Sequence, residues 1–71
     1  MHTITVTLEP QGLTLEFTGI KSVVALLNKL EKKRTRVLVI RNEPQGPRLL
    51  TPDVMLRHGD HIVVRDVSSL G

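Results

Sequence analysis

Alternation of polar and non-polar positions predicts a β-hairpin at the amino end of the chain. Over residues 2–9 and 13–18, every second position carries a residue suited to face a core, and the positions between them carry mostly threonine or glutamate. A period of two is typical of a strand with one buried face. Residues 10–12, Pro-Gln-Gly, predict the turn, because proline fixes φ and glycine accepts a positive φ. The expected inward-facing side chains are His2, Ile4, Val6, Leu8, Leu13, Leu15 and Phe17.

A helical pattern follows the hairpin and predicts one long helix over residues 23–33. Its apolar side chains recur at helical spacing on one face, while polar side chains occupy the other. Ser22 stands directly before this run, where its hydroxyl can accept a hydrogen bond from an amide of the first turn. Basic residues close the segment and suit the negative end of a helix dipole. The apolar face comprises Val23, Leu26, Leu27 and Leu30, and the closing cations are Lys32, Lys33, Arg34 and Arg36.

Two apolar runs, separated by a segment rich in proline, come after the helix. Residues 37–40, reading VLVI, are too few for a second helix and predict a central or docking strand. Residues 42–48 hold two prolines and a glycine and predict an exposed loop. Leu49 and Leu50 follow and predict a short edge pair, at which the chain reverses direction.

The carboxyl-terminal third predicts one turn of helix and a final strand. Residues 51–52, Thr-Pro, have the pattern of an N-cap followed by a first-turn proline, so residues 53–56 are expected to form one helical turn that buries Leu56. A Gly-Asp turn at residues 59–60 then leads into an apolar strand over residues 62–67. The remaining residues are mostly small and polar.

These elements, taken in order, predict an α+β fold with the β-grasp (ubiquitin-like) arrangement. We expect a mixed sheet of roughly four to five strands with one long helix across one face. A right-handed crossover places the first and last strands side by side and parallel. Residues 1–67 are expected to form this domain, and residues 68–71 a flexible C-terminal tail. The expected core comprises Ile4, Val6, Leu15, Phe17, Val23, Leu27, Leu30, Val39, Leu56, Ile62 and Val64.

Composition narrows the possible functions. A chain of 71 residues supports one modest core, and the absence of cysteine excludes disulfides, thiolate zinc sites and a cysteine nucleophile. The formal net charge of +3 is small for a dedicated nucleic-acid binder. The amino end lacks the continuous apolar segment of a signal peptide, and no run approaches the length of a membrane span. We therefore expect a cytoplasmic protein without a membrane partner.

Acidic residues and histidines near the final turn are the candidates for side-chain chemistry. His58, Asp60 and His61 form an H-x-D-H string, but its spacing crosses a tight turn and no further ligand accompanies it. We expect a solvated turn there and no metal ion. Asp53 and Asp60 each lack a neighbouring acid, base or nucleophile that would complete a catalytic pair. The sequence therefore predicts a protein that is not an enzyme.

Several short motifs, spread over most of the chain, resemble one known family through their order and spacing, although no single motif carries the resemblance. In the second half they are a β-branched strand ending in Arg41 and Asn42, LLTPD at residues 49–53, Leu56, and HGDHI at residues 58–62. In the first half, Ser22 and Val23 are similar to the Thr-Val opening of that family's helix, with Leu26 and Leu27 at the positions of its paired leucines. The family that these motifs resemble is the ThiS/MoaD-type sulfur carriers, ubiquitin-like proteins of β-grasp fold.

The resemblance implies that the carboxylate of Gly71 is the reactive group and that Ser68, Ser69 and Leu70 form the tail behind it. In the family, a partner enzyme adenylates this carboxylate with ATP, and a thiocarboxylate then forms and donates sulfur. The carrier itself binds no cofactor and supplies no catalytic residue. The implied partners are the adenylating enzyme and a sulfur-accepting synthase of thiamine or molybdopterin biosynthesis. The family ends in Gly-Gly, whereas this sequence ends in Leu-Gly.

Relatives of this type dock their activating enzyme on an exposed, partly apolar sheet face beside the tail. By alternation with Val39, the side chains of Leu38 and Ile40 are expected to form such a face near Arg65. The alternative interpretation is a diverged, TGS-like module that binds RNA or protein, for which the basic residues between positions 32 and 36 are the supporting feature. Nucleic acid is the less favoured partner because no aromatic residue is interleaved with these cations for base stacking.

Overall fold

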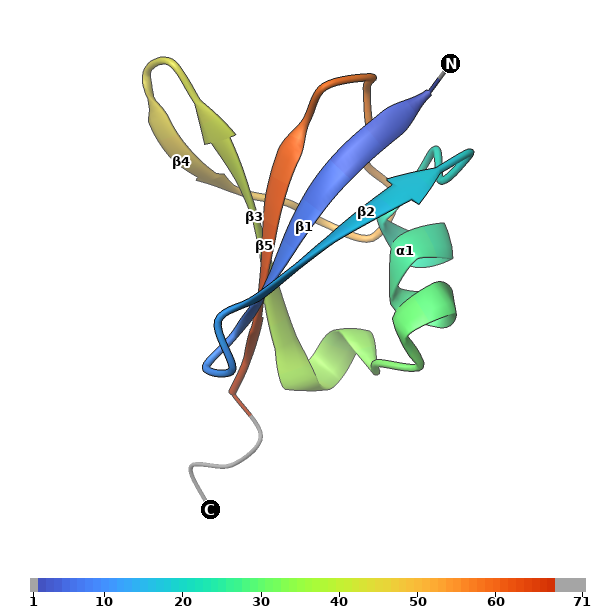
Figure 1. Cartoon of the computed structure of the whole chain (residues 1–71). Helices are drawn as coiled ribbons and strands as arrows, with labels where there is room; N and C mark the ends of the chain where they lie inside the picture. Colours follow the sequence, from blue (N-terminus) through green and yellow to red (C-terminus); the bar gives the residue numbers. More distant parts are fainter. Residues whose placement is uncertain (1, 68–71) are drawn as a thin grey trace.

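The computed structural model of the chain describes residues 2–67. These residues form a small α+β fold, with one α-helix packed on a five-stranded mixed sheet (Figure 1). The expected tail, Ser68 to Gly71, lies outside the described residues. The elements are β1 (Thr3–Glu9), β2 (Leu13–Thr18), α1 (Val23–Leu30), the 3-10 turn η1 (Arg34–Arg36), β3 (Val37–Glu43), β4 (Gly46–Leu49) and β5 (His61–Asp66).

The last strand lies at the centre of the sheet, whose strand order is β2-β1-β5-β3-β4. β1 and β5 are parallel, with Val6 beside Ile62, as the crossover rule predicts. The other neighbouring strands are antiparallel. Because β5 is paired with β1 on one edge and with β3 on the other, the point at which the chain leaves the sheet is firmly fixed.

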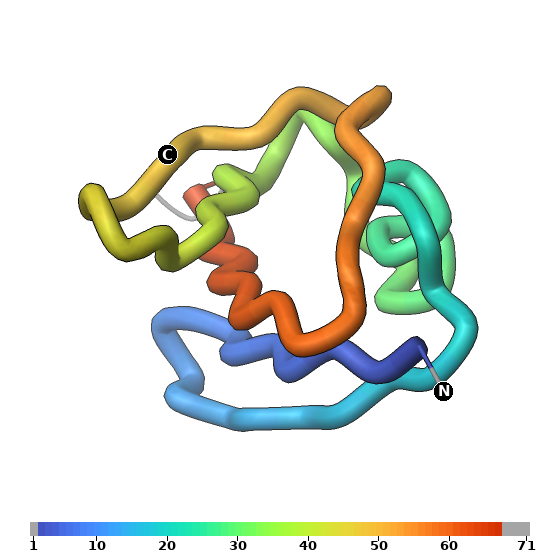
Figure 2. Tube along the Cα trace, turned by 90° about the horizontal axis from the view of Figure 1, so that it is seen from above, coloured from blue at the N-terminus to red at the C-terminus, as the bar shows by residue number. Residues whose placement is uncertain are grey.

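The core lies between α1 and one face of the sheet, and Figure 2 shows the helix on that side. Most of the expected core residues are buried, among them Leu56 at 4% exposure. None of the three expected inward side chains on β2 is fully buried: Leu15 and Phe17 are half-buried and Leu13 is exposed, because β2 is an edge strand with a neighbour on one side only. Leu30 of α1 is half-buried as well. The buried apolar side chains are Ile4, Val6, Val23, Leu26, Leu27, Val37, Val39, Leu50, Leu56, Ile62 and Val64.

α1 is shorter than the sequence pattern predicted, and the expected long helix over residues 23–33 is wrong. The helix ends at Leu30 because Glu31 adopts the left-handed conformation, with φ of 57°. The amide of Lys32 then bonds to the carbonyl of Leu27 at 2.9 Å, which closes the helix in a Schellman arrangement. Only polar and charged residues follow, so a further turn would bury no apolar side chain.

The two ends of α1 differ in how well the sequence predicted them. Ser22 caps the start as expected, because its Oγ accepts a hydrogen bond from the amide of Ala25 at 3.2 Å. Lys29 is the basic residue of the last turn. The cations of residues 32–36 lie beyond the helix, where the field of its dipole has fallen away. The predicted dipole interaction for that cluster is therefore wrong.

The expected exposed loop over residues 42–48 is also wrong, because β3 and β4 form a hairpin there. β3 continues to Glu43, the turn occupies residues 44–45, and β4 begins at Gly46. Pro47 pairs with Asn42 and is tolerated because β4 is an edge strand, where a missing amide leaves no partner unsatisfied. Leu50 does not form an edge pair with its neighbour; it is buried, and its amide bonds to the carbonyl of Val39 at 2.8 Å.

The segment between β4 and β5 runs beside the start of α1 and does not form the helical turn expected at residues 53–56 (Figure 2). Residues 52–53 form a turn, and Ser22 and Met55 form an isolated β-bridge. The amide of Val23 bonds to the carbonyl of Val54 at 3.0 Å. This segment therefore satisfies amides at the first turn of α1, which have no acceptor within the helix.

Candidate functional site

The face of the sheet opposite α1 carries the residues predicted to dock a partner. Leu38 lies opposite Arg65 across the β3–β5 pair, and Ile40 lies opposite Val63. Ile40 also lies opposite Leu49 across the β3–β4 pair. Directly opposed residues of antiparallel strands share a face, so these five side chains lie together. We call Leu38, Ile40, Leu49 and Val63 the open-face patch.

The open-face patch is most exposed toward the edge strand β4. Leu49 is 63% exposed and Leu38 is 37% exposed, whereas Ile40 and Val63 are half-buried between their neighbours. The expected outward pair therefore does point away from the core, but only Leu38 of that pair is exposed. Leu49 was not predicted for the site, because the proline-rich segment before it had been interpreted as a loop.

The other half of the open face is polar and is formed by β1 and β2. Cross-strand hydroxyl contacts join Thr3 to Thr18 at 3.4 Å and Thr7 to Thr14 at 3.3 Å. The apolar side chains of this face thus lie over β5, β3 and β4, next to a threonine-rich surface. An apolar area with a polar border is typical of a protein-binding surface and not of a catalytic pocket.

Arg65 lies at the border between the two halves. Its Nε donates to Oε1 of Glu9 at 2.8 Å, and both side chains are more than a third exposed. Exposed pairs of this kind stabilise a fold by about 0–1 kcal/mol. Arg65 can therefore exchange Glu9 for an acidic group of a partner at little cost to the free energy of folding.

The end of the described chain lies close to this face. Val67 follows β5 directly, and its amide bonds to the carbonyl of Arg36 at 3.0 Å. Leu38 and Arg65 form the second-last residue pair of the β3–β5 ladder before that exit. Figure 1 shows the carboxyl end of β5 at the lower end of the sheet, away from the amino terminus. Whatever docks on Leu38 thus also approaches the exit of the chain.

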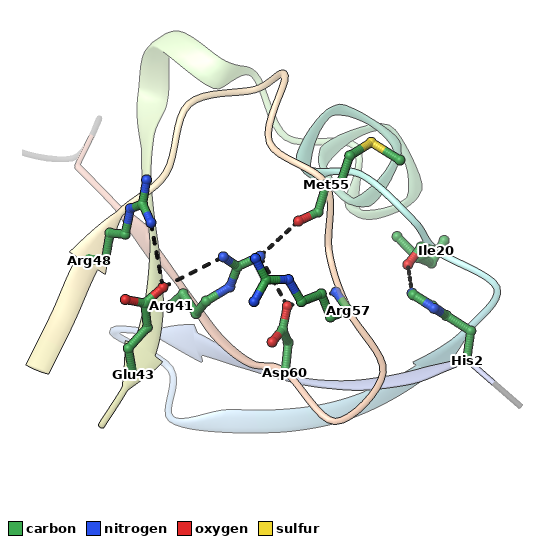
Figure 3. Close-up of polar contacts among 8 residues, drawn as sticks. All are labelled: His2, Ile20, Arg41, Glu43, Arg48, Met55, Arg57 and Asp60. Carbon is green, nitrogen blue, oxygen red and sulfur yellow. Dashed lines mark hydrogen bonds and ion pairs between the residues drawn. The ribbon is translucent and has the colours of Figure 1, made fainter. Parts of the chain in front are cut away.

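A buried polar centre around Arg41 was not predicted from the sequence. Arg41 is 5% exposed and points to the core side of the sheet, as the alternation from Val37 and Val39 implies. Its Nη2 donates to the carbonyl of Met55 at 2.8 Å and lies 3.1 Å from Oδ2 of Asp60 (Figure 3).

Its Nη1 lies 3.6 Å from Oε2 of Glu43, and we call Arg41, Glu43 and Asp60 the arginine clamp. Within the described residues its Nε has no partner. The clamp joins β3 to the loop that precedes β5. One guanidinium held by two carboxylates and a carbonyl leaves no free acid, base or nucleophile, so this centre is structural in character.

The H-x-D-H string does not converge on one point. His58 Nδ1 accepts a hydrogen bond from the amide of Thr3 at 3.0 Å. The ring of His61 lies elsewhere, with its Nε2 3.2 Å from the hydroxyl of Thr7 and its Nδ1 3.1 Å from the side-chain nitrogen of Asn42. The acidic residue between the histidines belongs to the arginine clamp and points elsewhere. Between residues 2 and 67, no three His, Cys, Asp or Glu side chains are grouped in a way that could hold a metal ion.

One acidic side chain has a perturbed pKa. Thr51 donates its hydroxyl hydrogen bond to Asp53, and this bond, together with the backbone amide of Asp53, lowers the pKa of that carboxyl below its usual value. Asp53 is exposed and belongs to the turn at residues 52–53, between β4 and β5. The lowered pKa keeps the carboxyl ionised near neutral pH and makes it a weaker base, so it does not suit a general acid and is a poor general base.

Among residues 2–67, no helix combines the length and apolar content needed to cross a bilayer. No protein-family model matches this chain, and no curated protein matches its sequence significantly.

Proposed function

We propose that this chain is a sulfur carrier of the ThiS/MoaD type and that its sheet is a β-grasp. The observation that carries the proposal is the position of β5, which runs through the centre of the sheet, parallel to β1, and ends at the border of the open-face patch. Such a strand presents the end of the chain beside a docking surface. The sequence resemblance supports the same function.

The proposed chemistry takes place at the carboxylate of Gly71, which lies outside the described residues. A carboxylate oxygen attacks the α-phosphorus of ATP, and pyrophosphate leaves, which gives an acyl adenylate. Hydrosulfide then attacks the carbonyl carbon, the bond from that carbon to the bridging oxygen breaks, AMP leaves, and a thiocarboxylate remains after loss of a proton. The partner enzyme supplies the site for ATP, and the carrier supplies the acyl group.

The described residues would contribute docking and positioning. The open-face patch offers apolar surface without backbone movement, because β3 lies between β4 and β5 and is paired with both. Arg65 offers a charge beside Leu38 that an acidic residue of the enzyme could bind in place of Glu9. The pairing of β5 on both edges fixes the origin of the tail relative to this surface.

Intact mass spectrometry tests the proposal. The chain is incubated with ATP, sulfide and the sulfur-carrier adenylating enzyme from the organism that makes it. Replacement of one carboxylate oxygen by sulfur adds about 16 Da, as a covalent modification of the terminus. A chain that lacks Gly71 serves as the control and should gain no mass. A parent chain that remains unmodified while the enzyme adenylates its known carrier normally, with release of pyrophosphate, would refute the proposed function.

A further inference from the structure

The net charge of this protein lies entirely at one end of the molecule. Of the ten Lys and Arg residues, five fall between positions 29 and 36, with Glu31 as the acidic residue among them. Asp66 lies beside Lys32, with 3.8 Å between Oδ2 and Nζ. These five positive and two negative charges leave +3, and the other five basic and five acidic residues cancel, so the remainder of the chain is neutral. We call Lys29, Lys32, Lys33, Arg34 and Arg36 the basic end.

Helix stabilisation does not account for the basic end. α1 ends at Leu30, so Lys29 is the basic residue in its last turn. Lys33, Arg34 and Arg36 are exposed, and within residues 2–67 no ion pair joins them to an acidic side chain. Like charges held this close together repel one another and lower stability slightly, so a structural role is a poor explanation for them.

The basic end borders the point where β5 leaves the sheet. The carbonyl of Arg36 accepts a hydrogen bond from the amide of Val67 at 3.0 Å, and Lys32 forms an ion pair with Asp66, the last residue of β5. In Figure 1 the segment after α1 and the end of β5 meet at the lower end of the molecule. The positive charge is therefore concentrated around the exit of the chain.

The surface of the basic end is hollowed on both sides of Lys32 and Lys33. One hollow lies between these lysines and the end of β5, and the other lies between them and α1. The first is lined by Glu31, Lys32, Lys33, Arg36, Val37 and Asp66, and the second by Val24, Leu27, Asn28, Lys32, Lys33, Arg34 and Thr35. The second hollow has three cations and no carboxylate in its lining, so it can receive short acidic side chains from a partner surface.

We infer that the basic end is a contact surface for an acidic protein surface and that it orients the carrier with its chain exit toward that surface. The inference rests on the proposed function, under which the partner is the adenylating enzyme, with acidic residues around the entrance that receives Gly71. A charge confined to one pole gives the molecule a preferred orientation during diffusional encounter. Steering of this kind raises association rates by roughly 10- to 1,000-fold at low salt.

An acidic protein fits this surface better than a nucleic acid does. Proteins that bind single strands combine cations with aromatic side chains on which bases stack. The aromatic residue of this chain is Phe17, which is half-buried and packs against the core. The basic end therefore offers charge without a stacking surface, which suits carboxylates on a folded partner.

Stopped-flow association with the adenylating enzyme tests the inference. The variant K33E/R36E reverses two exposed charges of the basic end. The control K21E/R57E reverses two exposed charges elsewhere, and each pair changes the net charge by four, from +3 to −1. At 50 mM salt we expect the first variant to associate at least about tenfold more slowly, with dissociation changed less than about twofold. The control should associate within about threefold of the parent, and salt should slow the parent but hardly K33E/R36E.

Each outcome separates the inference from the proposed function. Equal slowing of both variants would show that only total charge matters and would overturn the inference. An association rate that changes neither with salt nor in K33E/R36E would overturn the inference. If the parent still gains the sulfur mass normally, the proposed function is unaffected by that result. No mass gain in the parent would refute both. Tight binding of a fluorescein-labelled uridine 20-mer, lost in K33E/R36E while enzyme association is unchanged, would make the basic end a nucleic-acid surface. Melting curves confirm that both variants fold.

Discussion

The arginine clamp gives the sharpest test of the fold, because the same strand pair carries a matched control. Arg41 and Arg48 lie opposite each other across β3 and β4, and both are near Oε2 of Glu43, at 3.6 and 3.9 Å. Their side chains differ in exposure, 6% for Arg41 against 65% for Arg48. Substitution of each by alanine therefore removes the same charge from the same carboxylate in a buried and in an exposed setting.

The expected loss for Arg41→Ala follows from what the substitution leaves behind. Asp60 has a side-chain exposure of 14% and loses the cation at 3.1 Å, and the carbonyl of Met55 loses its donor at 2.8 Å. Breaking a buried ion pair from one side costs about 3–5 kcal/mol. A domain of this size has a total stability of roughly 4–11 kcal/mol, so the loss is a large part of it. For Arg48→Ala we expect less than about 1 kcal/mol, as for other exposed pairs.

Urea denaturation and thermal melting measure both variants. A loss of 1 kcal/mol lowers the Tm of a domain this small by roughly 4–8 °C, so Arg41→Ala should melt at least about 12 °C below the parent. If Arg41→Ala does not fold, Asp60→Asn provides the same test, because it removes the charge from the carboxylate and keeps the shape. Equal melting temperatures for the Arg41 and Arg48 variants would refute the assignment of the clamp as a buried structural centre.

Three further substitutions test the core, the patch and the tail. Leu27→Ala removes a side chain that is 3% exposed, so urea denaturation should show a loss of about 2–5 kcal/mol; a parent-like midpoint would contradict the packing of α1 on the sheet. Leu38→Glu places a carboxylate opposite Arg65, so the variant should have the Tm of the parent. Calorimetry should nevertheless show no binding of this variant to the adenylating enzyme. The control variant Thr14→Glu, altered on the polar half of the same face, should bind normally. Leu70 lies outside the described residues, and Leu70→Gly should leave the Tm unchanged. If Leu70 overfills a channel of the enzyme shaped for glycine, the substitution should raise the rate of mass gain by roughly ten- to a hundredfold. An unchanged rate would contradict the idea that Leu70 overfills the channel.

Local patterns were sufficient for three of the strands and for the start of the helix. Alternation predicted β1 and β2, because a strand with one buried face shows its period directly in the sequence, and a Gly-Asp turn before an apolar run predicted β5. Ser22 was a reliable signal for the same reason, since its hydroxyl acts within the first turn that follows. The parallel pairing of β1 and β5 needed only the handedness of the crossover between them.

The wrong predictions have three different causes. Residues 53–56 have a helix-start signature, but the free amides of α1 recruit this segment as acceptors, which a local pattern cannot indicate. Pro47 suggested a loop, although an edge strand accepts proline on its outer side. The length of α1 depended on whether residues after Leu30 had anything to pack against, and they do not.

The candidate site was predicted in part. Leu38, Ile40 and Arg65 share a face because strand alternation and the neighbouring positions of β3 and β5 follow from the fold class. Leu49 was missed together with the hairpin that positions it. The parity of Arg41 with Val37 and Val39 is visible in the sequence, but its partner Asp60 comes from the distant loop before β5, and only Glu43 lies on the same strand.

The open-face patch and the basic end lie on different sides of the same exit, and they act over different distances. Charge interactions reach about 8 Å at physiological salt, so the basic end would act first and set the orientation of approach. Burial of apolar surface acts only at contact, at about 25 cal/mol per Å² removed from water, so the open-face patch would determine how long the complex lasts. Because β5 is paired with β1 up to Arg65 and with β3 up to Asp66, a partner that engages both surfaces has the chain exit at a fixed position between them. The two surfaces should therefore be separable by kinetics: charge reversal at residues 33 and 36 should slow association, whereas Leu38→Glu should lose binding through fast dissociation, with association little changed.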